Sequence, residues 1–411
     1  MKFDLLIFKN KNFLLYWISS WCTALGDAIF IITLTWMLTE ETNSPTVVGT
    51  YLFILGCSKA IFILIGGIVV DRIDSRKLMI ITYLVRSLLM IIFFCVNLEG
   101  IPSIWVFYVM ASIFGVVDSI SEPAVITWRT KILEKQYYTQ SMSLLMLTGN
   151  ISAVLGPMVA TGIIYLSGSK VVLLVNATTY VVASLLFIMI TPVKENKLHI
   201  APPLNSLLND FKVGLFYFFK TPIILTMAIF AFFTNAAIGV MQVSVPFLVK
   251  NYGYGIETFG LLNTAIAVGS VIGGIIFSLF VISNARPTMT IITCFFQGII
   301  LFLVGHVNHI WLMVSLFALI GLLETAVNVI APSVNHTIIP PKIFGRVISI
   351  LILVMSGSIP ISQAIAGYLM KWIEPNTIFI YAGVLEISAA VMVFSLPFVR
   401  NYNVNQKNTT N

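Results

Sequence analysis

Twelve long apolar runs constrain the fold of this 411-residue chain more than any other feature. A helix needs roughly 20 apolar residues to cross about 30 Å of hydrocarbon, at about 1.5 Å per residue. Strands of a transmembrane β-barrel are about half as long and alternate in polarity, and these runs do neither. The chain is therefore predicted to be an all-α integral membrane protein with twelve transmembrane helices. The runs lie at 13–38, 47–70, 78–98, 103–128, 141–166, 171–191, 222–249, 257–282, 287–306, 310–332, 346–370 and 377–399.

The placement of positive charge predicts which end of each helix faces the cytoplasm. With a cytoplasmic N-terminus, 18 of the 23 Lys and Arg residues fall in cytoplasmic segments, which is the positive-inside bias. An even number of spans then puts both termini in the cytoplasm. The first run is too long for the apolar core of a cleavable signal, so we expect it to stay as an anchor in the cell membrane (inner or plasma membrane). The net charge of +7 follows from this topology and does not indicate a nucleic-acid partner.

One polar stretch, 192–221, separates six predicted spans from six others. Within it, residues 204–219 carry apolar side chains at helical spacing with Asn, Asp and Lys between them. That pattern predicts an amphipathic helix at the cytoplasmic surface of the membrane. We expect an N-terminal six-helix bundle at 1–191, a cytoplasmic linker at 192–221 and a C-terminal six-helix bundle at 222–411.

The two predicted bundles resemble each other at a shift of 206–208 residues. Matches at nearly one shift, in corresponding spans, indicate a duplicated six-helix unit and hence two pseudo-symmetric bundles. Transporters with two such halves place the substrate site near the bilayer midplane, between the repeats. The matching positions are Gly66 with Gly273, Gly115 with Gly321, Asp118 with Glu324, and Asp27 with Asn235.

Ionisable side chains inside the predicted spans are the first candidates for a functional site. A charge in hydrocarbon costs several kcal/mol, so such residues mark transport pathways by default. They comprise five acids and two bases: Asp27, Asp118, Glu122, Glu324 and Glu386, with Lys59 and Arg86.

Polar residues also share helix faces, since side chains four or seven positions apart lie on one side of a helix. Together with Asp27, the polar faces lie on the first, fourth, seventh and tenth spans. The first and fourth spans of one half correspond to the seventh and tenth of the other. That regularity predicts a polar path for substrate and protons. The spaced pairs are Asp118 with Glu122, Glu324 with Asn328, and Asn235 with Gln242.

Two roles stay open for these acids. Removal from water favours the neutral form of a carboxyl group, which lets the group carry a proton, and Asp27 and Glu324 lie deep in their spans. Alternatively, an acid is the fixed partner of a base that locks two helices together. Lys59 is either such a counter-ion or a ligand for an anionic group of the substrate. Arg86 and Glu386 fall on spans expected at the periphery, where a structural role is favoured.

The segment between the second and third spans reads Gly67-Ile-Val-Val-Asp71-Arg72-Ile-Asp74-Ser-Arg76-Lys77. It resembles the loop signature of the major facilitator superfamily, in which a glycine precedes Asp-Arg, a second glycine and a basic pair. Asp74 stands where the second glycine usually occurs. The resemblance implies that Gly67, Asp71, Arg72, Arg76 and Lys77 form a conformational switch, with Asp71 able to cap the next helix or to pair with arginine. The alternative is an ordinary basic turn at the membrane surface.

The fifth span contains Gly149 and then Gly156-Pro157. This looks like a weakened form of the glycine-proline motif of the superfamily's proton-coupled exporters, because Ala160 and Thr161 replace the usual glycine pair. The resemblance implies a hinge and outward transport. A packing glycine beside an unrelated proline is the alternative.

The resemblance covers the whole chain and is nearest to the branch with drug efflux pumps and siderophore exporters. It implies a proton-coupled exporter that works by alternating access, with protons and a small organic molecule as partners, in a monomer. Because acids and bases both lie within the spans, we favour a zwitterionic or carboxylate-bearing metallophore such as a siderophore. A multidrug or macrolide-type antibiotic efflux pump is the alternative, and nutrient import comes third.

Other classes of function lack support. No Walker-type nucleotide loop occurs, so ATP is not the expected energy source, and no cofactor or metal is expected. The four histidines lie at span ends or in loops, which leaves a membrane-embedded enzyme without a convergent catalytic group, and no repeated filter indicates a channel. The four cysteines lie on different spans without CxxC spacing: Cys22, Cys57, Cys95 and Cys294.

Overall fold

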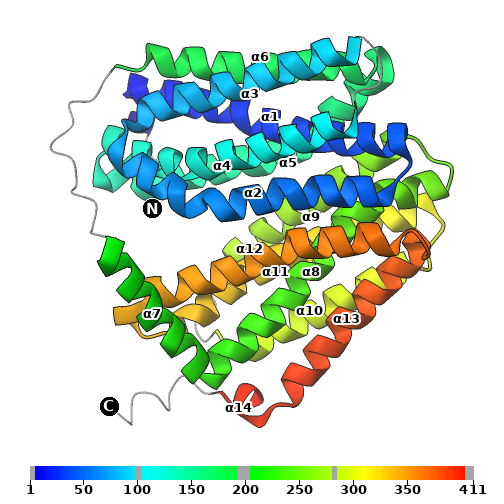
Figure 1. Ribbon diagram of the computed structural model, residues 1–411. Coiled ribbons are helices and arrows are strands. Elements are labelled where there is room, and N and C mark those ends of the chain that lie inside the picture. Colours follow the sequence, from blue (N-terminus) through cyan, green and yellow to red (C-terminus); the bar gives the residue numbers. More distant parts are fainter. Residues whose placement is uncertain (1–4, 99–102, 192–203, 280–284, 403–411) are drawn as a thin grey trace. The chain divides into compact units, whose positions relative to one another are not determined.

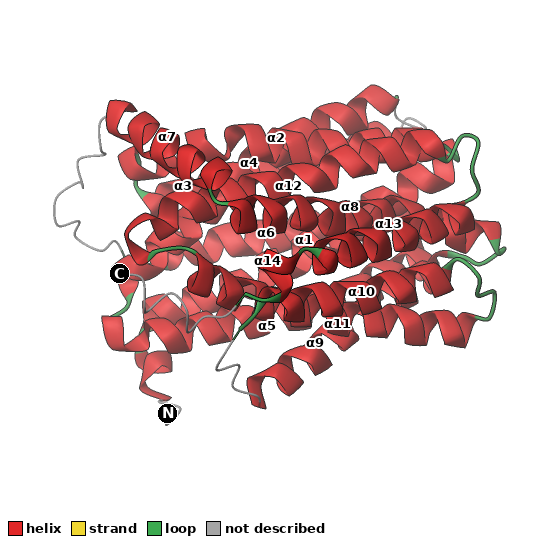
Figure 2. Cartoon of the chain, turned by 90° about the horizontal axis from the view of Figure 1, so that it is seen from below, coloured by secondary structure: helices red, strands yellow, loops and turns green. Residues whose placement is uncertain are grey.

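The computed structural model describes residues 5–98, 103–191, 204–279 and 285–402, without the side chains of Leu5, Leu6, Leu64, Ile68, Asp71, Thr130, Lys135 and 204–211. Within these ranges all regular structure is helical (Figures 1 and 2). Twelve of the described helices are long and apolar enough to cross a membrane. The predicted fold class is confirmed.

The first six spans correspond to α1 to α6, and several of these helices are longer than the predicted apolar run. All four cysteines are free. The bounds are α1 Lys11–Thr42, α2 Pro45–Arg72, α3 Ser75–Leu98, α4 Ile104–Ile132, α5 Tyr138–Ser167 and α6 Ser169–Met189, with short 3₁₀ helices at Leu5–Lys9 and Lys135–Tyr137.

The second six spans correspond to α8 to α13, and the expected amphipathic helix is α7. The first twelve residues of the predicted linker, 192–203, lie outside the described residues. The bounds are α7 Leu204–Lys220, α8 Pro222–Asn251, α9 Ile256–Leu279, α10 Pro287–Val304, α11 Ile310–Ile338, α12 Phe344–Leu369, α13 Pro375–Ser395 and α14 Pro397–Arg400, with a 3₁₀ helix at Pro341–Ile343.

Several helix ends have identifiable causes. The side chain of Asn10 accepts a hydrogen bond from the backbone nitrogen of Phe13 at 3.1 Å, which caps the start of α1. Asn43 ends α1 in the left-handed conformation, at φ 46°. Three later spans begin on proline, at Pro222, Pro287 and Pro375, where the missing N–H leaves no hydrogen bond unmade.

The chain divides into two compact units. Unit 1 contains residues 1–43, 54–201 and 255–264, and unit 2 contains 44–53, 202–254 and 265–411. The domain boundaries expected from the sequence stay predictions.

Each unit repeats the same set of helix contacts. In unit 1, α1 packs on α5 and α6, and α3 packs on α4 and α6. In unit 2, α8 packs on α12 and α13, and α10 packs on α11 and α13. When α1 to α6 are matched in order with α8 to α13, each of the four helix contacts in unit 1 has its counterpart in unit 2. The internal duplication inferred from the sequence therefore appears in the packing (Figure 1).

Glycines matched by the duplication bring corresponding helices into backbone contact. A Cβ added at Gly66 would collide with the backbone of α4, and one at Gly115 would collide with α2. In unit 2, Gly321 of α11 and Gly273 of α9 make the equivalent contacts between these two helices. Small residues allow such close approach where lipid provides no hydrophobic force between helices. The matched glycines therefore serve the same spacing role in both units.

Candidate functional site

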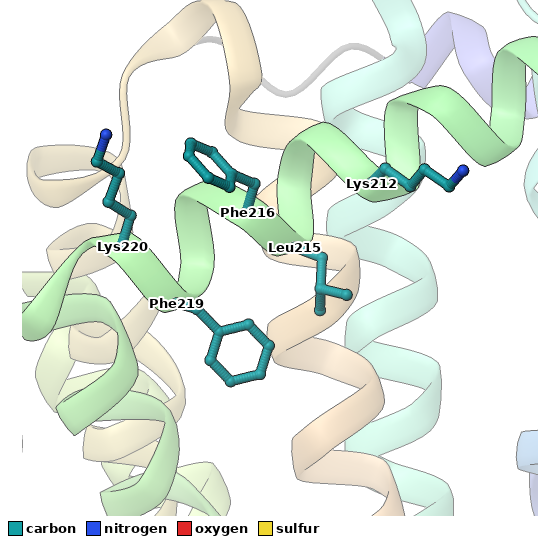
Figure 3. A pocket seen from close by; sticks show the side chains of 5 residues that line it. All are labelled: Lys212, Leu215, Phe216, Phe219 and Lys220. Atoms are coloured by element: carbon teal, nitrogen blue, oxygen red, sulfur yellow. The ribbon is translucent and has the colours of Figure 1, made fainter.

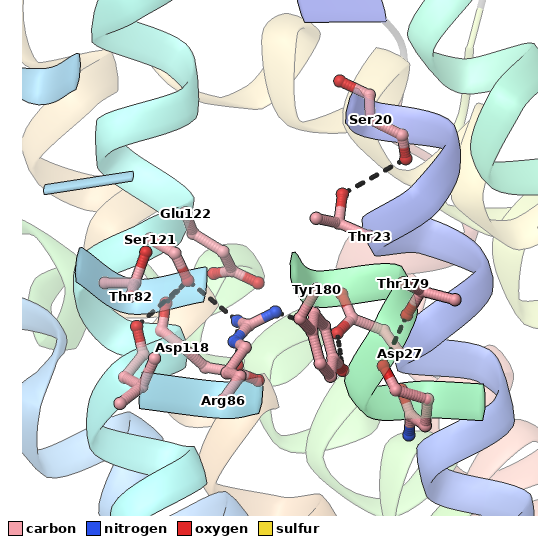
Figure 4. Close-up of polar contacts among 12 residues, drawn as sticks. Ser20, Thr23, Asp27, Thr82, Arg86, Asp118, Ser121, Glu122, Thr179 and Tyr180 are labelled. Atoms are coloured by element: carbon pink, nitrogen blue, oxygen red, sulfur yellow. Dashed lines mark hydrogen bonds and ion pairs between the residues drawn. The ribbon is translucent and has the colours of Figure 1, made fainter. Parts of the chain in front are cut away.

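Arg86 is the centre of the charged site in unit 1. It projects from the middle of α3, and only 5% of its side chain is exposed. Its guanidinium donates from Nη1 to Asp27 Oδ1 at 2.8 Å and from Nη2 to the carboxylate of Asp118. Nη2 also donates to Ser121 Oγ at 2.9 Å. Three helices thus meet on one buried cation, and Figure 4 shows the side chain between the residues of α4 and Asp27.

Gly26, the neighbour of Asp27 in α1, allows α1 to pack closely on α6. A Cβ at Gly26 would lie 3.1 Å from the side-chain oxygen of Asn176 and 3.2 Å from the ring of Tyr180, so α1 approaches α6 closely here. Tyr180 then donates its hydroxyl to Asp27 Oδ1 at 2.8 Å, and its ring lies 5.6 Å from the Arg86 guanidinium. Charge-assisted hydrogen bonds of this kind fix the carboxylate in place.

Lys59 and Glu122 form a separate ion pair in unit 1. The pair depends on the crossing of α2 and α4, because a Cβ at Gly115 would lie only 2.9 Å from the backbone nitrogen of Lys59. The two side chains are 36% and 54% exposed, respectively, so this pair is far more accessible than Arg86. Glu122 follows Asp118 by one helical turn, so the two acids lie on the same face of α4. Asp118 pairs with Arg86, whereas Glu122 pairs with Lys59.

The described charges of this site do not balance. Asp27, Asp118 and Glu122 face two basic partners, Arg86 and Lys59. With every group ionised, one negative charge has no positive partner. The site therefore carries a formal surplus of one negative charge, and its two more exposed carboxylates are Asp27 at 49% and Glu122 at 54%.

The predicted polar residues of unit 2 form a weaker network. Gln242 of α8 accepts a hydrogen bond from Gln363 of α12 at 2.7 Å. Asn235 donates to the carbonyl of Ala231 in its own helix at 2.8 Å. Among the described residues, no basic side chain forms an ion pair with Glu324, and Asn328 is exposed one turn further along α11. The amides and acids predicted here are therefore not joined into one cluster, in contrast to unit 1.

Glu386 lies in α13 and is completely buried. Neither of its carboxyl oxygens has a hydrogen-bond partner among the described residues. A carboxylate in such a place is costly, and the neutral acid is the form that such a site accommodates. The structural role expected for Glu386 stays a prediction.

The loop between α2 and α3 shows a different capping residue from the one considered in the sequence. Asp74 accepts a hydrogen bond from the backbone nitrogen of Arg76 at 3.0 Å and so caps α3. Arg76 donates to the carbonyls of Phe187 at 3.1 Å and Ile188 at 2.7 Å, which fastens it to the end of α6. The side chain of Asp71 lies outside the described residues, while Arg72 and Lys77 are exposed.

Two predicted motif glycines have open space around them. A Cβ at Gly67 or at Gly149 would have no neighbour within 4 Å, whereas the adjacent Gly66 is in backbone contact with α4. Gly156 packs against Ala28 of α1, and Pro157 is buried within α5, which continues through it as an unbroken helix. The hinge and switch roles of these residues stay predictions.

A profile described as Major Facilitator Superfamily matches residues 16–282 and 227–410. The chain belongs to the major facilitator superfamily. Its fold and family are therefore those of membrane transporters, as the loop and glycine-proline motifs indicated.

Several members of the superfamily are similar over most of the chain. The uncharacterised MFS-type transporter YkuC of Bacillus subtilis is 21% identical, over 94% of this chain and 92% of the relative. Macrolide efflux protein A of Streptococcus pyogenes is 21% identical, over 93% and 95%. The enterobactin exporter EntS of Citrobacter koseri is 23% identical, over 74% and 72%. The crystal structure of the nucleoside transporter NupG matches with a TM-score of 0.78 at 13% identity, over 95% of this chain and all of that one, and this likeness concerns the fold.

Three polar residues of this superfamily member were not singled out from the sequence: Ser121, Tyr180 and Gln363. A signal existed for Tyr180, because it lies 206 residues before Glu386, at the shift of the internal repeat. In unit 1 the matched residue, Tyr180, donates its hydroxyl to an acid, Asp27. In unit 2 the matched residue, Glu386, is itself an acid. For Gln363, the only signal was an amide within an apolar span.

Proposed function

We propose that this protein is a proton-coupled exporter of a small organic solute, and that it works by alternating access. The observation that carries the proposal is the unbalanced charge of the site in unit 1. A membrane-embedded site with one surplus carboxylate is suited to bind either a proton or a cationic group of the solute. Binding one excludes the other, which is the requirement for exchange.

Asp27 is the residue proposed to exchange the proton. Its side chain is 49% exposed, whereas that of Arg86 is 5% exposed. A proton on Asp27 removes the charge that attracts Arg86 and leaves the guanidinium to Asp118. A positively charged solute group that approaches the exposed oxygen of Asp27 provides the same neutralisation without the proton. Protonation and solute binding therefore both weaken the ion pair between Asp27 and Arg86.

The pairing of both bases changes the expected solute. A zwitterionic or carboxylate-bearing metallophore was favoured because acids and bases both lie within the predicted spans. In the structure each base is bound to acids of its own unit. A solute with a cationic group is thus the leading candidate, and the relatives named for macrolide efflux and enterobactin export support outward transport.

A solute of mixed charge is the second candidate, and it rests on the exposure of the Lys59–Glu122 pair. More than a third of each side chain is exposed, so an anionic group is able to compete with Glu122 for Lys59. A Lys59→Met variant distinguishes the two candidates. It should impair transport of a carboxylated solute much more than transport of a cation without an acid.

The test uses the purified protein in liposomes with an imposed pH gradient and a panel of cationic, zwitterionic and anionic solutes. We expect solute accumulation against its gradient together with proton release, measured with a pH-sensitive dye inside the liposomes. Asp27→Asn should abolish the coupled movement, while Glu40→Gln, exposed near the C-terminal end of α1, should retain it. Coupled exchange at the normal rate in Asp27→Asn would contradict the proposed role.

A further inference from the structure

The amphipathic helix α7 has one face buried in unit 2. Gly214 lies against the backbone of Arg346 in α12, where a Cβ would be 3.0 Å from the carbonyl oxygen. Phe218, one turn later, is only 4% exposed and packs into a cluster of apolar side chains from α8, α11 and α12. This face anchors the helix firmly to the rest of the unit.

The opposite face of α7 has no partner among the described residues. At 100° per residue, Lys212, Phe216, Phe219 and Lys220 fall within one third of the helix circumference. Phe216 is 68% exposed and Phe219 is 62% exposed, a large apolar surface that a soluble protein seldom leaves in water. We call these four residues the outer face of α7.

The outer face combines aromatic rings with positive charge at its two ends. Lys220 Nζ lies 5.2 Å from the centre of the Phe216 ring, and Lys212 precedes Phe216 by one turn. Together with Leu215 the four residues line a groove of about 470 Å³ (Figure 3). The groove therefore has an apolar floor and ammonium groups at its rim.

The surroundings of α7 are also basic. Exposed Arg and Lys side chains lie at the beginning of α10, at the junction of α11 and α12, and in α14. In the same unit, the described acidic side chains are in the middle of helices or at the opposite end, at Glu324, Glu374 and Glu386. No described carboxylate thus competes for the lysines of the outer face. The basic residues are Arg286, Lys342, Arg346 and Arg400.

We propose that the outer face of α7 binds an anionic phospholipid of the cytoplasmic leaflet. Phe216 and Phe219 enter the boundary between headgroups and acyl chains, as the apolar face of an interfacial helix does. The lysine stems lie along the apolar surface and place their ammonium groups at the level of the phosphate. Because the buried face of α7 packs on α12 at Gly214, a change in the position of α7 at the lipid surface also acts on α12.

The test measures lipid binding of the full-length purified protein and does not depend on the transported solute. Phosphatidylglycerol and phosphatidylcholine are titrated separately, and bound lipids are counted by native mass spectrometry. We expect tighter binding of phosphatidylglycerol, weakened about fivefold by each of Lys212→Gln and Lys220→Gln, since a lysine near an anionic surface contributes about 1 kcal/mol. Phosphatidylcholine binding should not change.

Lys371→Gln is the matched control, because Lys371 is exposed and lies 4.9 Å from the Tyr368 ring at the opposite end of unit 2. The control should bind phosphatidylglycerol like the unaltered protein. Equal loss in the control, or unchanged binding in the Lys212→Gln/Lys220→Gln variant, overturns the proposal. Displacement of the lipid by millimolar inorganic phosphate also overturns it, since it would assign the face to a free anion. If the double variant unfolds, phosphatidylglycerol binding by Lys220→Gln alone is compared with the control, and unchanged binding overturns the proposal.

Discussion

Gly115 of α4 lies so close to Lys59 of α2 that a methyl group at Gly115 would be 2.9 Å from the Lys59 backbone nitrogen. This crossing brings the Lys59 side chain to Glu122, one turn beyond Asp118 on α4. The charged site of unit 1 is therefore positioned by residues that carry no charge.

We expect Gly115→Ala to destabilise the protein by about 1–3 kcal/mol, because the methyl group forces α2 and α4 apart. The matched control is Gly67→Ala, in open space on α2, which should stay within about 1 kcal/mol of the unaltered protein. Unfolding of the purified protein by increasing SDS measures both. Equal stability of the two variants would show that the crossing tolerates a Cβ.

The ion pairs of Arg86 and the ion pair of Lys59 should differ in their contribution to stability. Arg86→Met leaves Asp27 and Asp118 without their shared buried partner, and we expect a loss of about 3–5 kcal/mol. Lys59→Met removes a pair that is more than one third exposed, and such pairs contribute about 0–1 kcal/mol. The same unfolding experiment compares them. A larger loss of stability in Lys59→Met than in Arg86→Met would contradict the conclusion that Arg86 is the more deeply buried base.

Glu386→Met should leave stability unchanged or raise it by about 1–3 kcal/mol, because it replaces a buried acid without a partner by an apolar side chain of similar volume. Glu386→Gln keeps a buried polar group and should be less stable than Glu386→Met. Transport should persist in Glu386→Met, in contrast to Asp27→Asn. Loss of proton-coupled transport in Glu386→Met would move the proton site to unit 2.

Asp74→Ala should cost about 1 kcal/mol, the usual contribution of a helix N-cap. Asp74→Asn keeps an oxygen that accepts the hydrogen bond from the Arg76 nitrogen, so most of the stability should remain. Thermal unfolding of both variants measures the difference. An equal loss in both would assign the effect of Asp74 to its charge.

The sequence predicted the fold well because lipid imposes strict requirements. Span length, the positive-inside bias and the repeat each depend on one-dimensional spacing, and the twelve helices follow from them. Asp118 and Glu122 were likewise placed on a shared face by helical periodicity alone.

The pairing of charges could not be predicted in the same way. Arg86 was expected at the periphery because of the span it lies in, yet its long side chain reaches both Asp27 and Asp118. Which acid meets which base depends on helix rotation, and the glycines where these helices approach closely, Gly26 and Gly115, carry no chemical signal of their own. Tyr180 escaped notice for a related reason, since a tyrosine in an apolar span is common.

The four matched glycines, Gly66, Gly115, Gly273 and Gly321, have a practical consequence for mutational scanning. A side chain substituted at any of these positions meets the backbone of a neighbouring helix, so each should tolerate few replacements, as the charged residues do. A map of mutational sensitivity alone would therefore mark both groups as one site. Only a comparison of protein abundance with solute flux, variant by variant, separates the residues that space the helices from those that contact the cargo.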